Sequence, residues 1–403
     1  MKIRMNPNIA NLHSYPFEKW ASLKADIQEN RNYEAIALSI GEPKHAAPQF
    51  VLDELTAKLN TIASYPLTKG SEALRESIAQ WLNQRFKLEN APINPQTQVI
   101  PVNGTREALF AFAQAVIDPT KNPVVLAPNP FYQIYEGAAI LAGAEIQFLN
   151  ATRENDFRPD LDTVSADTWK RCQLIYICSP GNPTGKVLSA DYLEKLLHLA
   201  EKHDFIIASD ECYSEIYFDE DNPPPGLLQV AASTGRDSYK HCVVFHSLSK
   251  RSNLPGLRSG FVAGDAEVLK QFLRYRTYHG CAMAPPSQAA SIVAWNDEIH
   301  VKNNRALYRS KFEAVLKILQ PVLDVQAPDA GFYLWPKTPI NDQAFAKALY
   351  AEKNITVLPG SFLSRVYDNI NPGEDYIRMA LVAEIDQCVT AANHIKDFLK
   401  TLN

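Results

Sequence analysis

The chain has 403 residues, of which 46% are hydrophobic and 21% charged, a composition typical of globular proteins. This length exceeds what one compact core usually holds, so we expect about two domains. The net charge of −5 at pH 7 gives no electrostatic basis for binding nucleic acid. No run approaches the roughly 20 apolar residues that a membrane helix needs, which argues against a membrane partner.

The N-terminal string MKIRMNPNIANLHSYPF lacks the apolar core of a secretory signal peptide. The six cysteines show no C-x-x-C spacing and lie in or beside apolar runs, where a reduced cysteine behaves as a small hydrophobic residue. Disulfide bonds are uncommon in long chains without a secretory signal. We therefore expect a reducing compartment, the cytoplasm.

From about residue 45 to 290, strand-like apolar runs alternate with helical patterns, which predicts a parallel sheet with crossover helices. An arm with one amphipathic stretch, 17–27, precedes this region. Strands are predicted at 98–102, 124–126, 145–149, 174–178, 205–209, 243–246 and 259–262. Helices are predicted at 71–86, 105–117 and 189–203, the last with Ser189 at its N-cap, and a surface loop at 219–226.

After residue 290 the pattern changes to one long helix, 297–319, followed by strand-like pieces at 331–335, 355–358 and 376–382. We expect an α/β protein with two domains. The large domain, 45–290, carries a mostly parallel seven-stranded sheet flanked by helices. The smaller α+β domain comprises 291–403, joined by part of the N-terminal segment 1–44.

The segment SLSKRSNLPGLRSG (247–260) follows the predicted strand 243–246. A lysine at the end of a buried strand is unusual, because removing an ammonium group from water is costly. A Schiff base between Lys250 and an aldehyde cofactor would relieve that cost and hold the amine in place as a nucleophile. Arg258, eight residues later, can bind a phosphate. One loop therefore supplies an amine that can bind an aldehyde and a guanidinium that can bind an anion.

This segment resembles the lysine signature of the class I and II pyridoxal-phosphate aminotransferases, the aspartate-aminotransferase-like family. The resemblance runs from about Leu38 to the C-terminus. It implies that Lys250 carries pyridoxal 5'-phosphate, that Ser247 and Arg258 bind this cofactor, and that 45–290 is the cofactor-binding domain. The spacing Ser247-x-x-Lys250 also occurs in serine acyl-enzymes such as class A β-lactamases, but the K-T-G and S-D-N elements of those enzymes are absent.

Other candidate residues follow the predicted strands, because ligands of open parallel sheets bind beyond the carboxyl ends of the strands. After 98–102, the string NGTRE (103–107) opens a helix whose N-terminus can accept a phosphate. An ordinary helix start would look the same. In the resembled family the matching glycine and the next residue hold the cofactor phosphate, which assigns Gly104 and Thr105 to cofactor binding, with Arg106 beside them.

After 174–178 comes SPGNPTGK (179–186), which has one residue too few between its glycines for a P-loop. It resembles the family's N-P-T-G turn, in which Asn182 donates to the phenolic oxygen of the cofactor and borders the substrate. Asp210, after 205–209, can keep a pyridine nitrogen protonated, because each charge offsets the other's desolvation. The resemblance gives Asp210 this catalytic role and makes Tyr213 a donor to the phenolic oxygen. A purely structural role for Asp210 remains open.

An aromatic ring from PNPFY (128–132) can stack on the pyridine ring; the resemblance favours Tyr132, with Phe131 as the alternative. Tyr65 matches a tyrosine that reaches the phosphate of the neighbouring subunit, which implies a homodimer with shared active sites. Arg378 matches the arginine that binds the substrate α-carboxylate, a role suited to its planar fork, with Gly41 beside it. No metal is expected.

Three longer strings, SIGEPKH (39–45), NPFYQIYEG (129–137) and LPGSFLSR (358–365), resemble one subgroup, the N-succinyldiaminopimelate aminotransferases of bacterial lysine synthesis. The expected reaction exchanges an amino group between N-succinyl-LL-2,6-diaminopimelate and 2-oxoglutarate. The alternatives are an aminotransferase for aspartate, aromatic amino acids or alanine, a β-lyase with the same cofactor, and a non-catalytic regulator. The regulator would need an added DNA-binding domain, for which the N-terminal arm is too short.

Overall fold

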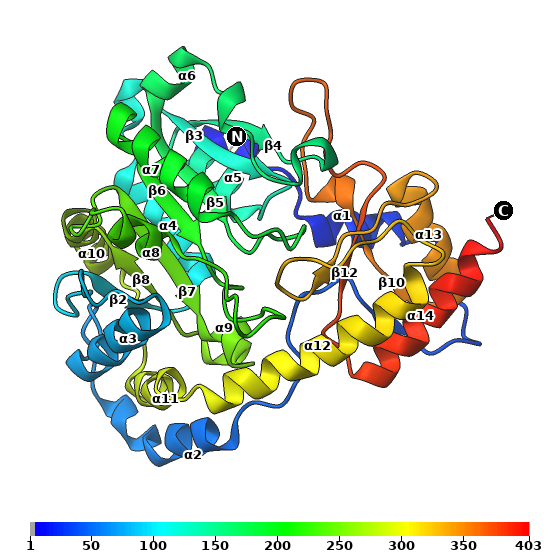
Figure 1. Cartoon of the computed structure of the whole chain (residues 1–403), viewed down its shortest axis with the longest axis horizontal. Coiled ribbons are helices and arrows are strands. Elements are labelled where there is room, and N and C mark those ends of the chain that lie inside the picture. Colours follow the sequence, from blue (N-terminus) through cyan, green and yellow to red (C-terminus); the bar gives the residue numbers. More distant parts are fainter. Residues whose placement is uncertain (1–4, 403) are drawn as a thin grey trace.

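The computed structural model describes residues 5–402 and is built around a twisted central sheet (Figure 1). This seven-stranded sheet has the order β2-β8-β7-β6-β5-β3-β4, and β8 alone runs antiparallel to its neighbours. Every predicted strand of the large domain is confirmed, with small shifts at the ends. The bounds are Val99–Val102 (β2), Val124–Asn129 (β3), Glu145–Asn150 (β4), Cys172–Cys178 (β5), Ile206–Asp210 (β6), Cys242–Ser247 (β7) and Gly260–Gly264 (β8).

Helices cover both faces of the central sheet, which explains why its inner strands are apolar throughout rather than alternating. Along β3, Val124 and Leu126 face one layer of helices, whereas Val125 and Ala127 face the other. We call the apolar residues of these two layers the large core. One layer contains α4 (Thr105–Val116), α5 (Ile134–Leu141) and α10 (Ala266–His279); the other contains α2 (Gln49–Ala57), α3 (Glu72–Arg85), α6 (Ala166–Arg171), α7 (Ala190–His203), α8 (Leu227–Ser233) and α11 (Pro285–Trp295).

The predicted helix starts are confirmed by their caps. Ser189 Oγ accepts a hydrogen bond from the backbone N–H of Tyr192 at the start of α7, and Ser71 Oγ does the same for Leu74 in α3. No helix within residues 5–402 is long and apolar enough to cross a membrane.

A second group of buried apolar residues, the small core, lies beside the central sheet and joins the two ends of the chain (Figure 1). Its helices are α1 (Pro16–Leu23), α12 (Ile299–Leu319), α13 (Asp342–Lys353) and α14 (Ile385–Leu399). Its short strands are β1 (Ile36–Ala37), parallel to β10 (Ile355–Thr356), and the antiparallel set β11 (Leu358–Pro359), β12 (Ile377–Ala380) and β9 (Tyr333–Leu334).

The prediction of one continuous strand at 355–358 is wrong. Ile355 pairs with Ile36, whereas Leu358 pairs with Arg378, so neighbouring residues belong to two different sheets. The buried Val357 separates the two pieces. An apolar run of this length predicts a buried extended segment but does not reveal where its pairing changes.

The predicted surface loop 219–226 is only partly on the surface. Pro224 and Gly226 are buried, and the carbonyl oxygen of Pro224 accepts a hydrogen bond from Arg85 at 3.2 Å. Glu220 in the same loop forms an ion pair with Arg305 of α12. The loop therefore fastens the large core to α12.

Apart from residues 212–216, which pack into the small core between two elements of the large core, the chain crosses between the two cores at two places. The first crossing lies between Leu38 and Val51, and the second lies between Trp295 and Tyr308. The second crossing includes the start of α12, which runs from beside α9 (Leu248–Arg251) and α11 towards α14 (Figure 1).

Candidate active site

A cavity of about 710 Å³ lies where the carboxyl ends of the sheet strands meet the small core. Its walls come from the loops after β2, β5, β6 and β7 and from the segments around residue 40, β11 and β12. The cavity brings together most of the residues singled out in the sequence, namely Gly41, Thr105, Arg106, Tyr132, Asn182, Asp210, Tyr213, Ser247, Lys250, Arg258 and Arg378.

Lys250 lies in α9, a single turn whose N-cap is Ser247. Its Nζ donates a hydrogen bond to the carbonyl oxygen of Gly41 at 2.5 Å. Burial lowers the pKa of Lys250 to about 8, and the nearby guanidinium of Arg378 acts in the same direction. The amine is therefore partly unprotonated near neutral pH, as a nucleophile or a proton acceptor must be.

Asp210, the last residue of β6, points into the cavity from its floor. Its Oδ2 accepts a hydrogen bond from the hydroxyl of Tyr135 at 2.7 Å, and its Oδ1 accepts one from the backbone N–H of Cys212 at 3.3 Å. Burial raises the pKa of Asp210. Within residues 5–402 no cationic side chain forms an ion pair with it, so a bound ligand that offers a positive N–H group here would be matched.

The opposite wall of the cavity offers positive groups. Gly104 caps α4 with φ of +83°, and a Cβ atom at this position would lie 2.4 Å from Nη2 of Arg258. Only a glycine therefore lets the arginine lie against the helix N-terminus. Thr105 follows at the first position of α4, and Ser247 lies close to Ser249, with 3.0 Å between their hydroxyl oxygens. Together a helix N-terminus, hydroxyl groups and a guanidinium form a cradle suited to a phosphate.

Arg378 is buried in β12 and approaches the cavity from the small core. Its Nη1 donates to Oδ1 of Asn182 at 3.0 Å, and its Nη2 donates to the carbonyl oxygen of Ser39 at 2.8 Å. Its Nε has no hydrogen-bond partner in the described chain. An arginine with spare donors at a cavity wall suits a carboxylate ligand.

The two tyrosines at residues 213 and 333 meet at the wall of the cavity. Their hydroxyl oxygens are 3.0 Å apart, and burial raises the pKa of Tyr213 well above its usual value, so its hydroxyl remains a proton donor. A Cβ atom on Gly41 would overlap the Tyr333 hydroxyl at 1.9 Å. Glycine at this position therefore lets the backbone approach the ring.

The two adjacent aromatic residues that the sequence left open face opposite ways. Tyr132 lines the cavity, and its hydroxyl accepts a hydrogen bond from Nε of Arg106 at 2.8 Å. Phe131 points into the large core, with its ring centroid 4.8 Å from that of Phe148. Tyr132 is thus the ring available to a bound cofactor.

Tyr65 is the one predicted site residue that lies far from this arrangement. It does not line the cavity, and its side chain is fully exposed, close to the exposed apolar side chains of Ile62 and Leu67.

Several residues in or directly beneath the cavity were missed by sequence reasoning. Tyr135 holds Asp210 across 75 positions of sequence, and Tyr333 contacts both Tyr213 and the Gly41 backbone. Cys212 contributes its thiol, which lies 3.1 Å from the hydroxyl of Thr105. Tyr135 lies in the quoted string 129–137, Tyr333 lies in the predicted strand 331–335, and Cys212 follows Asp210 by two residues. No local pattern marks any of the three as part of the site.

Comparisons with known proteins show the family of this chain. The family model for aminotransferase class I and II matches residues 33–392. An LL-diaminopimelate aminotransferase from Nitratidesulfovibrio vulgaris is 32% identical over 97% of this chain and 98% of its own length.

Two solved structures are also similar. An aminotransferase from Neisseria meningitidis is 50% identical, with a TM-score of 0.94 over 99% of this chain and 100% of that chain. A structure described as a probable N-succinyldiaminopimelate aminotransferase from Thermus thermophilus is 26% identical, with a TM-score of 0.85 over 95% of this chain and 100% of that chain. The chain belongs to the class I and II aminotransferases, enzymes that depend on pyridoxal phosphate.

Proposed function

We propose that this enzyme transfers the amino group of a diaminopimelate-type donor to 2-oxoglutarate, with N-succinyl-LL-2,6-diaminopimelate as the donor, in lysine biosynthesis. The observation that carries the reaction type is a partly neutral, buried lysine that shares one cavity with an unpaired carboxylate and the guanidinium of Arg378. The donor class is supported by the three strings named above and by the similar protein from Thermus thermophilus.

A second candidate donor is LL-diaminopimelate without the succinyl group. It is favoured by the curated relatives from several bacteria that are described as LL-diaminopimelate aminotransferases. The two donors share the amino acid end and differ at the distal nitrogen, which is charged in one and an amide in the other.

In this proposal Asp210 and the cradle of Gly104, Thr105 and Arg258 would hold the cofactor. Pyridoxal phosphate supplies a conjugated, electron-withdrawing aldehyde that makes the α-proton of an amino acid acidic. Asp210 would keep the pyridine nitrogen protonated, because within residues 5–402 no cationic side chain forms an ion pair with its buried carboxyl group. The cradle binds the phosphate, with Ser247 and Arg106 beside it, and Tyr132 covers one ring face.

Lys250 then acts as the proton carrier. When its amine is free, Nζ would take the proton from the substrate α-carbon and carry it to the next acceptor. Burial lowers the pKa of this amine and thereby favours the unprotonated form that accepts the proton. Tyr213 and Asn182 donate hydrogen bonds to the phenolic oxygen of the cofactor. Arg378 binds the substrate α-carboxylate through its fork, and the backbone beside Gly41 borders the same carboxylate.

We also propose that the enzyme works as a homodimer in which Tyr65 binds the phosphate of the cofactor held by the partner subunit. The support is the exposure of Tyr65 together with Ile62 and Leu67, since a large exposed apolar group is characteristic of an interface. Tyr65→Phe should weaken cofactor binding although Tyr65 lies outside the cavity of its own chain. A dissociation constant equal to that of the parent enzyme would contradict this role.

The donor is tested by a half-reaction without acceptor. The holoenzyme is mixed with N-succinyl-LL-diaminopimelate, LL-diaminopimelate, aspartate, alanine or phenylalanine, and the loss of the visible band of the bound cofactor is followed by stopped flow. The succinylated donor should react fastest. Faster reaction with LL-diaminopimelate would select the second candidate, and a preference for aspartate, alanine or phenylalanine would refute the proposed donor class.

A further inference from the structure

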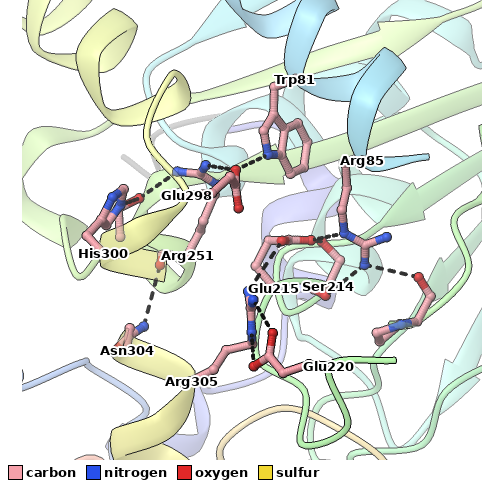
Figure 2. A network of polar contacts seen from close by, with 12 residues as sticks. Trp81, Arg85, Ser214, Glu215, Glu220, Arg251, Glu298, His300, Asn304 and Arg305 are labelled. Carbon is pink, nitrogen blue, oxygen red and sulfur yellow. Dashed lines mark hydrogen bonds and ion pairs between the residues drawn. The ribbon is translucent and has the colours of Figure 1, made fainter. Parts of the chain in front are cut away.

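Lys250 is held by its backbone as well as by its amine, through a buried asparagine on α12. Asn304 directs its Nδ2 at the carbonyl oxygens of Lys250 and Arg251, at 3.5 and 3.4 Å. Figure 2 shows this contact between Asn304 and the turn that carries Arg251. On its other side, Oδ1 of Asn304 accepts a hydrogen bond from Asn253 at 3.0 Å and lies 2.7 Å from Nδ1 of His45.

His45 links this asparagine to a buried lysine. Nε2 of His45 lies 2.6 Å from Nζ of Lys311, which also donates to the carbonyl oxygen of Val382 at 3.3 Å. Lys311 lies seven residues after Asn304 in α12, a spacing of two helical turns that puts both side chains on one face. The contacts therefore run from Lys311 through His45 and Asn304 to Lys250.

The chemistry of the end groups fixes the direction of every hydrogen bond in this series. The carbonyl oxygens of Lys250 and Arg251 only accept, so Asn304 must present its NH₂ group to them and its oxygen to His45. His45 must then carry its proton on Nδ1. Its Nε2 is left as an acceptor, and this matches the ammonium of Lys311, which only donates.

This arrangement requires a neutral imidazole at His45. Burial is the main cause that lowers the pKa of His45, and the positive charge of Lys311 acts in the same direction. A protonated ring would present a second cation to Lys311 at 2.6 Å and would leave Lys311 without this acceptor.

The series also joins the two segments that cross between the cores. His45 lies in the first crossing, and Asn304 lies in the second. Gly41, four residues before His45, accepts the hydrogen bond from Nζ of Lys250. The segment 41–45 therefore acts on Lys250 in two ways. Gly41 accepts a hydrogen bond from its side-chain amine, and His45 orients Asn304, which contacts its backbone carbonyl oxygen.

We propose that Lys311, His45 and Asn304 form a directed hydrogen-bond chain that positions Lys250 for proton transfer. His45 and Asn304 are positioning residues, since neither lines the cavity. The inference rests on the role proposed above for Lys250. A displacement of about 1 Å of a reacting group can cost roughly 100-fold in rate, so a loose backbone at Lys250 should slow the proton step.

Other contacts hold the same turn independently, so the chain can be cut without unfolding it. Arg251 donates to the carbonyl oxygen of Ala294 at 2.7 Å and pairs with Glu298, which also accepts from Trp81. His300 lies 2.8 Å from the hydroxyl of Ser252. Figure 2 shows Trp81, Glu298 and His300 around Arg251.

Asn304→Asp is the sharpest perturbation. The carboxylate keeps the size and the acceptor atoms that face His45 and Asn253 but has no hydrogen to donate to the two carbonyl oxygens. We expect kcat to fall at least about tenfold, with the KM for the amino donor changing less than about threefold. His45→Leu should behave similarly, and His45→Asn, which retains an N–H close to the place of Nδ1, should recover most of the lost kcat.

Val315→Ala is the matched control. Val315 is a fully buried residue of the small core on the same helix and does not take part in the chain. Its truncation should lower the melting temperature but leave kcat within about twofold of the parent. A fall in kcat as large as that of Asn304→Asp would show that general loosening of α12, not the chain, is responsible.

The order of measurements separates this inference from the proposed function. Borohydride reduction of the parent holoenzyme, followed by peptide mapping, should attach the cofactor to Lys250; attachment elsewhere would overturn the proposed function and the chain with it. With Lys250 labelled, a folded Asn304→Asp holoenzyme that retains the parent kcat, or a His45→Asn variant no better than His45→Leu, would overturn the chain alone.

Discussion

Gly104 offers a direct test of the phosphate cradle. Its φ of +83° and ψ of 152° lie in a region that is accessible almost only to glycine, and Gly104→Ala should cost about 1–3 kcal/mol of folding stability from this strain. The added Cβ would also lie 2.4 Å from Nη2 of Arg258. To reach ordinary contact the guanidinium would have to withdraw by roughly 1 Å.

This displacement of the guanidinium should weaken the binding of the cofactor phosphate by Arg258. A hydrogen bond between charged groups contributes about 1.5–3 kcal/mol. Its loss corresponds to a dissociation constant for pyridoxal phosphate that is about 10- to 100-fold higher. The assay is a titration of apoenzyme with pyridoxal phosphate, followed by the visible band of the bound cofactor, with thermal unfolding of the apoenzyme measured in parallel.

Gly235→Ala separates strain from crowding. Gly235 also has a positive φ, +77°, but a Cβ atom there would meet nothing within 4 Å. This variant should lose stability and keep the cofactor affinity of the parent. If Gly104→Ala bound the cofactor within about twofold of the parent affinity, the cradle would not be the phosphate site.

The remaining predictions concern Lys250, Asp210 and Arg378. Lys250→Met should abolish turnover, and it should stabilise the apoenzyme at pH 7 by up to about 3 kcal/mol, because the parent buries an amine whose pKa falls to about 8 on folding. The difference in stability between the Lys250→Met variant and the parent should shrink between about pH 8 and 10.5 and vanish above that range, because the unfolded parent then also loses the proton. A difference in thermal unfolding that stays constant across this range would refute the prediction. Asp210→Asn should still bind the cofactor but lower kcat about 100-fold or more. An unchanged kcat would mean that a residue other than Asp210 keeps the pyridine nitrogen protonated. Arg378→Lys should raise the KM for the amino donor about tenfold or more in steady-state assays, so a normal KM would contradict its role.

Much of the fold was accessible from the sequence, because it depends on local patterns. The strands of the central sheet are buried on both faces, so each is a short, continuous apolar run. Such a run can be recognised in the sequence without knowing which strands lie beside it. Lys250, Asp210 and Asn182 drew attention because each lies within four residues of the end of such a run, and parallel strands bring their carboxyl ends to one edge of the sheet. The family resemblance then supplied the expected role of each.

The tertiary structure alone decided the contacts between distant segments. It turned Tyr132 into the cavity and Phe131 into the large core, gave Asp210 its donor Tyr135, and brought Tyr333 against Gly41. It also divided the run at 355–358 between two sheets.

These features share a physical cause. A local pattern of polar and apolar residues reports which face of an element is buried, but it carries no information on which other element covers that face. The link between His45, Asn304 and Lys250 depends on two crossings that are more than 200 residues apart in sequence. The sequence therefore determined which chemistry each segment could supply, and only the packing of the two cores decided which groups meet to perform it.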